Sequence, residues 1–415
     1  MLVFRTLCTL CLLLLLSVTT FAGSYNDARS IAMAGSYTAI ARGYETIGLN
    51  PANLALSDRP NTSIGIFGVG SLINNNAFSK GDYDKYNGSH LSEQDKQDIL
   101  DKIPADGLEF KGNTGASALS LSYGPFGFST TLEAGGRGTL SKDVVDLAFF
   151  GNKVGETINV DNSDGEGIAH VDFNLSYGRK IKSYDWGNVT AGLTVKYIRG
   201  LAVFEITQAD AQATTGYDGV NADGSMTVRS STGGSGYGID IGAAANYGKD
   251  WVFSLGIKNL ASSISWNNET KQTDYYFDVV GFTVQTADED TTVVSDEIEH
   301  SIGSYSTTLA PEVSLGASTN YGKFLVASDL KLGLKDSFGT TTTPELSVGT
   351  EYSALSYLPL RAGLSLGGIH GSSLALGGGV RIASFSFDVA WASSGTVLPK
   401  FGNGMSFAVS SGLKF

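Results

Sequence analysis

The sequence predicts an all-β fold: a transmembrane antiparallel β-barrel of about fourteen strands, preceded by an N-terminal segment that does not alternate like the barrel strands. Three observations support this prediction. Many segments alternate with period two, the connections between them alternate in length, and aromatic residues collect at the short connections. The 53 Gly, 18 Tyr and 21 Phe of the 415-residue chain also suit strands and turns. The competing all-β interpretation is a soluble array of β-sandwiches.

Alternation between apolar and polar or small residues is typical of a strand that has a different environment on each face. Apolar residues at 171, 173, 175 and 177, for example, alternate with polar residues at 172, 174 and 176. Such segments, separated by turn signals, are predicted at 62–72, 116–123, 126–134, 168–179, 187–199, 235–248, 250–258, 311–320, 323–332, 345–353, 358–367, 373–382, 384–391 and 405–415.

The connections favour a barrel over a sandwich. Links after even-numbered strands are tight, whereas four of the links after odd-numbered strands are long, at 73–115, 135–167, 200–234 and 259–310. Bacterial outer-membrane barrels have short periplasmic turns and long extracellular loops, and a sandwich has no reason to alternate in this way. An even number of strands that starts and ends at the short turns places both termini in the periplasm.

Aromatic residues lie next to the short connections, where the interfacial girdle of a membrane barrel would sit. The long connections are polar, and one contains a predicted helix at 92–103, with Ser92 as its N-cap and Pro104 after its end. We expect this helix to fold over the mouth of the barrel.

Residues 1–22 predict a cleaved signal peptide, with Arg5 as its charged start, an apolar run from about 7 to 18 and a small-residue cleavage site at 20–22. A membrane anchor is the alternative, but the run is shorter than the roughly 20 residues that a spanning helix needs. Cys8 and Cys11 both lie in this segment, so the mature chain carries no cysteine and no disulfide. We divide the chain into a signal peptide (1–22), an N-terminal segment without strand-like alternation that we call the hatch (23–60), and a barrel (61–415).

The hatch contains a local hook. Pro51 fixes its own φ and favours an extended Asn50, whose side chain can hydrogen bond to nearby backbone, so Asn50, Pro51 and Ala52 are predicted to form a rigid turn. The small residues at 32–36 would let the backbone lie close to the barrel wall. The alternative is an ordinary turn leading into the first strand.

In this segment the chain resembles the FadL-type outer-membrane family, which transports hydrophobic compounds. Its members resemble fourteen-stranded barrels whose N-terminal hatch packs as a plug inside the lumen, so the resemblance implies the same place for residues 23–60. Their hatch is rich in small residues and is followed about fifteen residues later by Asn-Pro-Ala, which residues 50–52 match. Two departures are Leu49, where the family has an aromatic residue, and Asn53-Leu54, where it has Gly-Leu. A related branch comprises the shuttle barrels of a surface-secretion system. The resemblance implies uptake of a hydrophobic small molecule, a long-chain fatty-acid-like compound or a hydrocarbon, by facilitated diffusion without a cofactor.

In that family a kinked strand opens the wall sideways towards the bilayer. The best candidate for such a kink here is Gly135, Gly136 and Gly138, because glycines permit bulges. These glycines could equally be the start of a loop.

The C-terminal segment ends in alternating apolar residues, Phe407, Val409, Leu413 and Phe415. This pattern resembles the signal by which barrels are passed to the outer-membrane assembly machinery, and the alternative is a chance terminal Phe on an amphipathic strand. The other expected partners are outer-membrane lipid and the hydrophobic ligand. In a second possible function, a barrel that escorts or anchors secreted proteins at the cell surface, the partner would be a secreted protein.

Enzyme and metal chemistry are not expected. The four histidines are scattered without metal-ligand spacing, and a catalytic pair would require His170 and Asp172 to converge on a cavity. The acidic stretches 82–88 and 161–166 lack the Gly and Glu positions of a calcium loop. The formal net charge of −13 offers no basic surface for nucleic acid.

Overall fold

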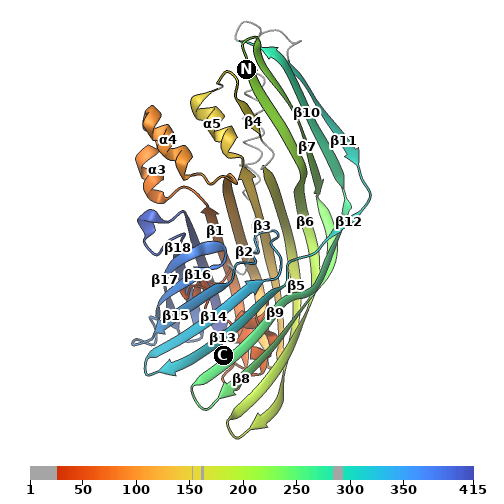
Figure 1. Cartoon of the computed structure of the whole chain (residues 1–415). Coiled ribbons are helices and arrows are strands. Elements are labelled where there is room, and N and C mark those ends of the chain that lie inside the picture. Colours follow the sequence, from red (N-terminus) through yellow and green to blue (C-terminus); the bar gives the residue numbers. More distant parts are fainter. Residues whose placement is uncertain (1–25, 152, 160–162, 284–292) are drawn as a thin grey trace.

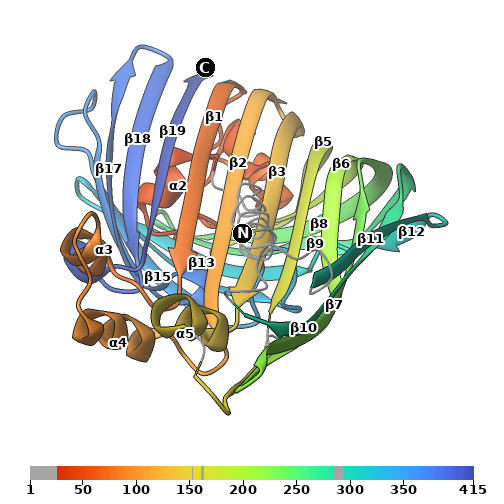
Figure 2. The same cartoon turned by 90° about the horizontal axis from the view of Figure 1, so that it is seen from above.

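Fourteen strands of the described chain close into an antiparallel barrel (Figure 2). The computed structural model describes residues 26–151, 153–159, 163–283 and 293–415, so the predicted signal peptide lies outside the described residues. The barrel strands are β1 (Thr62–Asn75), β2 (Leu108–Tyr123), β3 (Phe126–Leu140), β5 (Asp164–Tyr184), β6 (Gly187–Gly216), β8 (Gly233–Tyr247), β9 (Trp251–Asn268), β13 (Glu312–Tyr321), β14 (Phe324–Gly333), β15 (Glu345–Tyr352), β16 (Leu360–Gly367), β17 (Gly371–Ile382), β18 (Phe385–Ser394) and β19 (Gly404–Lys414).

Each of these strands pairs with the next one around the barrel. The ring closes where β19 pairs with β1, with Val69 opposite Val409. Every predicted segment overlaps one of these strands, so the predicted barrel of about fourteen strands is confirmed.

The two faces of the barrel wall have opposite polarity. On β5, Leu175 points outwards and is 62% exposed, whereas Asn174 points into the lumen and is 3% exposed. The same alternation follows other strands, so the outer surface is apolar and the interior is polar. A water-soluble protein has the reverse arrangement, and a lipid-facing barrel has this one.

Aromatic rings meet at the short connections. Trp186, in the turn between β5 and β6, lies 5.8 Å from the ring of Tyr247 at the end of β8. The ring centroids of Phe324 and Tyr352, on the paired strands β14 and β15, are 4.6 Å apart. These rings form part of a band at the end of the barrel where the girdle was expected.

The long connections gather at the opposite end, uppermost in Figure 1. They contain α3 (Lys80–Tyr86), α4 (Glu93–Lys102), α5 (Lys142–Phe150) and β4 (Thr157–Asn159). Two shorter connections at the same end contain η4 (Gly368–His370) and η5 (Pro399–Phe401). Helix α4 matches the predicted helix, because Ser92 caps it by accepting a hydrogen bond from the backbone N–H of Asp95. Among the described residues, no helix is both long and apolar enough to cross a membrane.

Two of the long connections are mostly strand, although the sequence predicted loops at 200–234 and 259–310. Strand β6 continues beyond the barrel and pairs with β7 (Gly219–Ser231), which pairs with β10 (Lys271–Phe282), and β10 pairs with β11 (Val293–Ser301). The short β12 (Tyr305–Thr307) returns the chain along β9. The prediction was wrong because the apolar positions of upper β6 are alanines, at 209, 211 and 213, which give a weak period-two signal.

The N-terminal segment lies inside the barrel (Figure 2). It consists of α2 (Ala28–Ala32), η2 (Gly43–Thr46) and η3 (Pro51–Ala55), joined by turns. Its backbone touches the wall because glycines of the wall leave room for it. A Cβ on Gly192 of β6 would collide with the backbone of Pro51 and Ala52, and one on Gly178 of β5 would lie 2.7 Å from the Pro51 carbonyl oxygen.

Gly192→Ala should therefore loosen the hatch by about 1–3 kcal/mol, because β6 is held in its ladders and cannot withdraw to make room. Hydrogen exchange at residues 50–55 of the assembled barrel would report the change as faster exchange. Gly378→Ala is the matched control, since its added Cβ would meet nothing closer than 3.5 Å. Equal exchange in the two variants would contradict the steric argument.

Candidate functional site

The predicted hook adopts a capped turn against the wall. Asn50 is extended, with φ of −145°, and its Oδ1 accepts a hydrogen bond from the N–H of Ala52 at 3.0 Å. Its Nδ2 donates to the carbonyl oxygen of Ala243 on β8, also at 3.0 Å. Pro51 occupies the first position of η3, where a missing N–H costs nothing. Asn50 therefore links the hatch turn to the barrel by one side chain.

Two further residues that hydrogen bond the hatch to the barrel wall were not predicted from the sequence. Asn53 donates from Nδ2 to the carbonyl oxygen of Thr38 at 2.8 Å and accepts from the hydroxyl of Ser254 on β9 at 3.0 Å. Asp329 on β14 accepts from the backbone N–H groups of Tyr37 and Thr38, at 3.0 and 2.8 Å. Asn53 comes three residues after Asn50, one helical turn away, which is the only sequence signal that could have indicated it.

A chain of ion pairs joins the hatch to the opposite wall. Arg29 of α2 pairs with Glu351 at 2.8 Å, Arg361 pairs with the same carboxylate at 2.6 Å, and Asp388 pairs with Arg361 at 2.7 Å and with Arg381 at 2.8 Å. Arg361 and Asp388 are buried. Moving α2 away would take Arg29 from Glu351 and leave a buried charge uncompensated. These ion pairs therefore hold α2 in its position.

Two carboxyl groups of the hatch have shifted pKa values. Burial would raise the pKa of Glu45, but Lys414 at 2.6 Å and Arg29 at 3.6 Å lower it to about 2. Burial, with the negative charges of Glu45 and Asp388 nearby, raises the pKa of Asp27 to about 6. Asp27 caps α2 by accepting from the N–H of Arg29 at 2.8 Å.

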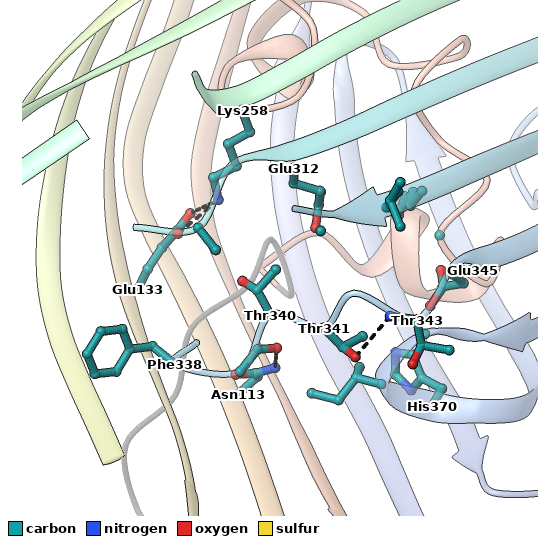
Figure 3. Close-up of a pocket in the computed structure, with 18 of the residues that line it drawn as sticks. Asn113, Glu133, Lys258, Glu312, Phe338, Thr340, Thr341, Thr343, Glu345 and His370 are labelled. Atoms are coloured by element: carbon teal, nitrogen blue, oxygen red, sulfur yellow. Dashed lines mark hydrogen bonds and ion pairs between the residues drawn. The ribbon is translucent and has the colours of Figure 1, made fainter. Parts of the chain in front are cut away.

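A cavity of about 180 Å³ lies in the lumen beside the hatch (Figure 3). Residues 30, 31, 34, 35 and 49 of the hatch form part of its lining, and inward-facing wall residues form most of the rest. The connection 334–344 between β14 and β15 folds in over it: the N–H of Phe338 donates to Glu166 of β5 at 2.9 Å, and Asn113 of β2 donates to the carbonyl oxygen of Gly339 at 3.3 Å.

One part of the cavity lining is charged. Lys258 on β9 pairs with both carboxylate oxygens of Glu133 on β3 at 2.9 Å. Glu312, Lys331 and Glu345 also line the cavity. Figure 3 shows Glu312 and Glu345 on the far side of the cavity from Phe338.

Another part is apolar. Ile168, Leu309 and Phe338 line the cavity and belong to a buried cluster that extends to Trp266. The indole N–H of Trp266 donates to the Thr307 hydroxyl at 2.9 Å, which satisfies its polar atom. The cavity therefore offers an apolar surface and charged groups to the same occupant.

Gly135, Gly136 and Gly138, the candidates for a strand kink, lie within β3. They pair with both β2 and β5, and neither ladder shifts register at these positions. A functional kink at these glycines stays a prediction.

An irregularity that the sequence did not reveal occurs in β9. Its register with β8 shifts between Ile257 and Ala261, so 258–260 bulge opposite Asp240, and Asn259 has a φ of 53°. Asp240 stabilises the bulge by accepting from the Asn259 N–H at 2.7 Å.

His170 and Asp172, the pair considered for catalysis, are in contact: Nδ1 lies 2.7 Å from the carboxylate. Both are buried in the lumen, and His170 lines the cavity. In the described part of the chain, no group of three or more His, Cys, Asp or Glu side chains could hold a metal ion. The stretch 82–88 is mostly helix α3, and Asp82 pairs with Lys102, while 161–162 lie outside the described residues.

The C-terminal residues close the barrel. Phe407 and Phe415 are exposed on the outer side, and the N–H of Phe415 donates to the carbonyl oxygen of Thr62 on β1 at 2.9 Å. Their expected recognition by the assembly machinery stays a prediction.

The sequence matches a protein family described as "Family of unknown function (DUF5723)" over residues 51–232 and 218–391. The chain belongs to this family. The matched regions of DUF5723 take in Pro51 and Ala52 of the hook, β1 through β17 and most of β18. No curated protein matches the sequence significantly.

Solved structures show what fold this DUF5723 protein has. It is similar to a Pseudomonas aeruginosa FadL homologue, with a TM-score of 0.54 and 14% identity over 96% of this chain and 100% of the other. It is also similar to the Pseudomonas putida toluene transporter TodX, with a TM-score of 0.51 and 13% identity over 95% and 99%. A TodX deletion mutant, described as a monoaromatic hydrocarbon channel, is similar with a TM-score of 0.53 and 12% identity over 96% of this chain and 100% of the other. The fold is therefore that of the FadL-like outer-membrane barrels.

Hatch docking should strengthen on mild acidification. A carboxyl group whose pKa is raised in the folded state binds extra protons between its two pKa values, so Asp27 stabilises docking at about pH 4 and loses that effect as the pH rises through about 6. Glu45, whose pKa is lowered, stabilises hatch docking above about pH 4.5 and loses this effect only as the pH falls towards 2. Hydrogen exchange at α2, corrected for intrinsic rates, should be slower at about pH 5 than at about pH 7.

Asp27→Asn should flatten this dependence while keeping the helix cap, because Asn is an equally good cap. Asp58→Asn is the control, since the Asp58 side chain on the hatch is 55% exposed. If Asp27→Asn kept the full pH dependence, another group would have to be responsible.

Proposed function

We propose that this protein lies in the outer membrane of a Gram-negative-type bacterium, with both termini in the periplasm, and lets a hydrophobic small molecule cross by facilitated diffusion. The observation that carries the proposal is the cavity enclosed by the docked hatch and the inward connection 334–344, with Ile168, Leu309 and Phe338 on its wall. A water-filled pore offers an apolar solute no favourable path, whereas a plugged lumen with an apolar pocket does.

The hatch would control passage in this proposal. The hook at Asn50, Pro51 and Ala52 would anchor it to β8, and undocking of the turns around it would open the lumen towards the periplasm. The similar fold of the toluene transporter TodX supports a hydrophobic solute, either a hydrocarbon or a compound like a long-chain fatty acid. No cofactor is needed because the solute moves down its gradient.

A second candidate function is the escort or anchoring of secreted proteins at the cell surface. It is favoured by the sheet that β6, β7, β10 and β11 build beyond the barrel. Within the described residues β11 pairs only with β10, and its side chains from 294 to 300 are exposed. Such a free strand edge can pair with a partner chain.

The compound that co-purifies with the barrel should be apolar and specifically enriched. We would extract the purified protein with organic solvent and identify the extract by mass spectrometry, beside a general porin purified in the same detergent. An enriched lipid or hydrocarbon would support transport and name the solute class. If no compound were enriched and a secreted protein co-purified, the escort function would be favoured instead.

Loosening the hook should change uptake without harming the barrel. Replacing Asn50 and Pro51 by Ala removes two hydrogen bonds and a fixed φ, a loss of about 1–3 kcal/mol of docking energy. Uptake into proteoliposomes of the solute identified above is expected to differ from wild type, while heat-resistant migration shows that the barrel has assembled. Asn61→Ala, at an exposed position after the hatch, is the control. Unchanged uptake in the hook variant would count against a gating hatch.

A further inference from the structure

The cavity carries an excess of negative charge. Five charged side chains of the described residues line it, three carboxylates and two ammonium groups, which leaves one net negative charge. These groups are Glu133, Lys258, Glu312, Lys331 and Glu345. Two histidines also line the cavity. Burial and the nearby Lys331 lower the pKa of His370 to about 4 and leave it neutral near pH 7, and His170 contacts Asp172 at 2.7 Å, so that carboxylate would balance any charge on it.

The pairing within this set is uneven. Glu133 and Lys258 satisfy each other through two contacts of 2.9 Å. The side chains of Glu312, Lys331 and Glu345 line the cavity and form no ion pair within 4.0 Å and no hydrogen bond with any described residue, although Lys331 stands opposite Glu345 in the ladder of β14 and β15. Lys331 can compensate one of these two carboxylates, so the other remains unbalanced.

The Glu345 carboxylate lies between the hatch and the connection that joins β16 to β17. A Cβ on Gly35 of the hatch would lie 3.3 Å from Glu345 Oε1 and 2.8 Å from Lys331 Nζ. A Cβ on Gly368, in the connection between β16 and β17, would lie 2.6 Å from Glu345 Oε2. Two glycines thus leave the space in which this carboxylate stands, and both have positive φ, 82° and 62°, which disfavours a side chain there.

The apolar wall lies across the cavity from these groups. Phe338 and Glu345 appear on opposite sides of the cavity in Figure 3, with Thr340 and Thr341 between them. A ligand that spans the cavity would therefore place a hydrocarbon part on Ile168, Leu309 and Phe338 and a polar head near Glu312 and Glu345.

We propose that the cavity binds amphiphiles with a positively charged amine head, with Glu312 and Glu345 receiving the ammonium group and the apolar wall receiving the hydrocarbon. The inference rests on the proposed transport function and narrows its solute class. An ammonium group balances the excess charge of the cavity, whereas a carboxylate head would add to it in a site where burial strengthens repulsion.

The test uses two probes that differ only in their head group. Dodecylamine is protonated at neutral pH and dodecanoate is ionised, and calorimetric titration into the full-length barrel in a nonionic detergent, with detergent blanks, gives the affinity of each. Wild type is expected to bind dodecylamine roughly tenfold tighter than dodecanoate. Equal affinities, or tighter binding of dodecanoate, would overturn the proposal.

Charge removal assigns the effect to the two carboxylates. Glu312→Gln with Glu345→Gln is expected to weaken dodecylamine binding roughly tenfold and to strengthen dodecanoate binding. The control pair is Glu297→Gln with Glu299→Gln on the exposed β11, which keeps the same net charge change and should alter neither affinity. An unchanged preference in the lumen variant would overturn the proposal, and Glu345→Gln alone serves if the double variant does not assemble.

Uptake of uncharged dodecanol into proteoliposomes separates this inference from the proposed function. Entry of dodecanol above the level of protein-free liposomes, with no preference for the amine in the titrations, would leave transport standing and refute the amine site. Tight amine binding without entry of any probe would refute transport and leave a binding site.

Discussion

Hydrogen bonding between β1 and β19 turns a curved sheet into a closed wall. Because the wall is closed, its outward side chains can be apolar and its inward side chains can be polar. A strand edge in hydrocarbon would expose a row of unpaired N–H and C=O groups, each of which costs several kcal/mol. The pairing that sets Val69 opposite Val409 removes both edges. Once the backbone is satisfied within the wall, outward side chains can be apolar, as Leu175 is, and inward ones such as Asn174 can be polar.

A polar interior creates the next requirement, because buried polar groups need partners. The hatch supplies many of them. Asp329 accepts two hatch N–H groups, Asn50 and Asn53 reach backbone and side-chain partners on both sides, and Arg29 extends the ion pairs of Glu351 into α2. The hatch can approach this closely only because glycines of the wall, such as Gly192, leave out the atoms that would collide with it.

The hatch does not fill the lumen, and the remaining space acquires a mixed character. Its apolar wall comes from the cluster around Trp266 and from Phe338, which the inward connection 334–344 carries into the barrel. Its charged wall contains one satisfied pair, Glu133 with Lys258, and three side chains without an ion pair among the described residues, Glu312, Lys331 and Glu345. In the proposed amine site, a single unbalanced charge in a medium of low effective dielectric would favour one head group over the other.

The sequence by itself determined the barrel and its strands, because period-two alternation, turn residues and connection lengths are local properties of the chain. The place of the hatch followed from the resemblance of the N-terminal segment to FadL-type proteins. The sequence also located the helix that Ser92 caps, and it singled out Asn50 and Pro51, whose turn is likewise local. It missed the sheet of β6, β7, β10 and β11, since alternation between alanine and polar residues outside the barrel is a weak signal. Only the tertiary structure decided which inward residues meet across the lumen: Asp329 with Thr38, the bulge of β9 on Asp240, and the approach of Glu312 and Glu345 to one cavity. Those contacts depend on strand register and on where the hatch rests, and both are set by packing between residues far apart in the chain.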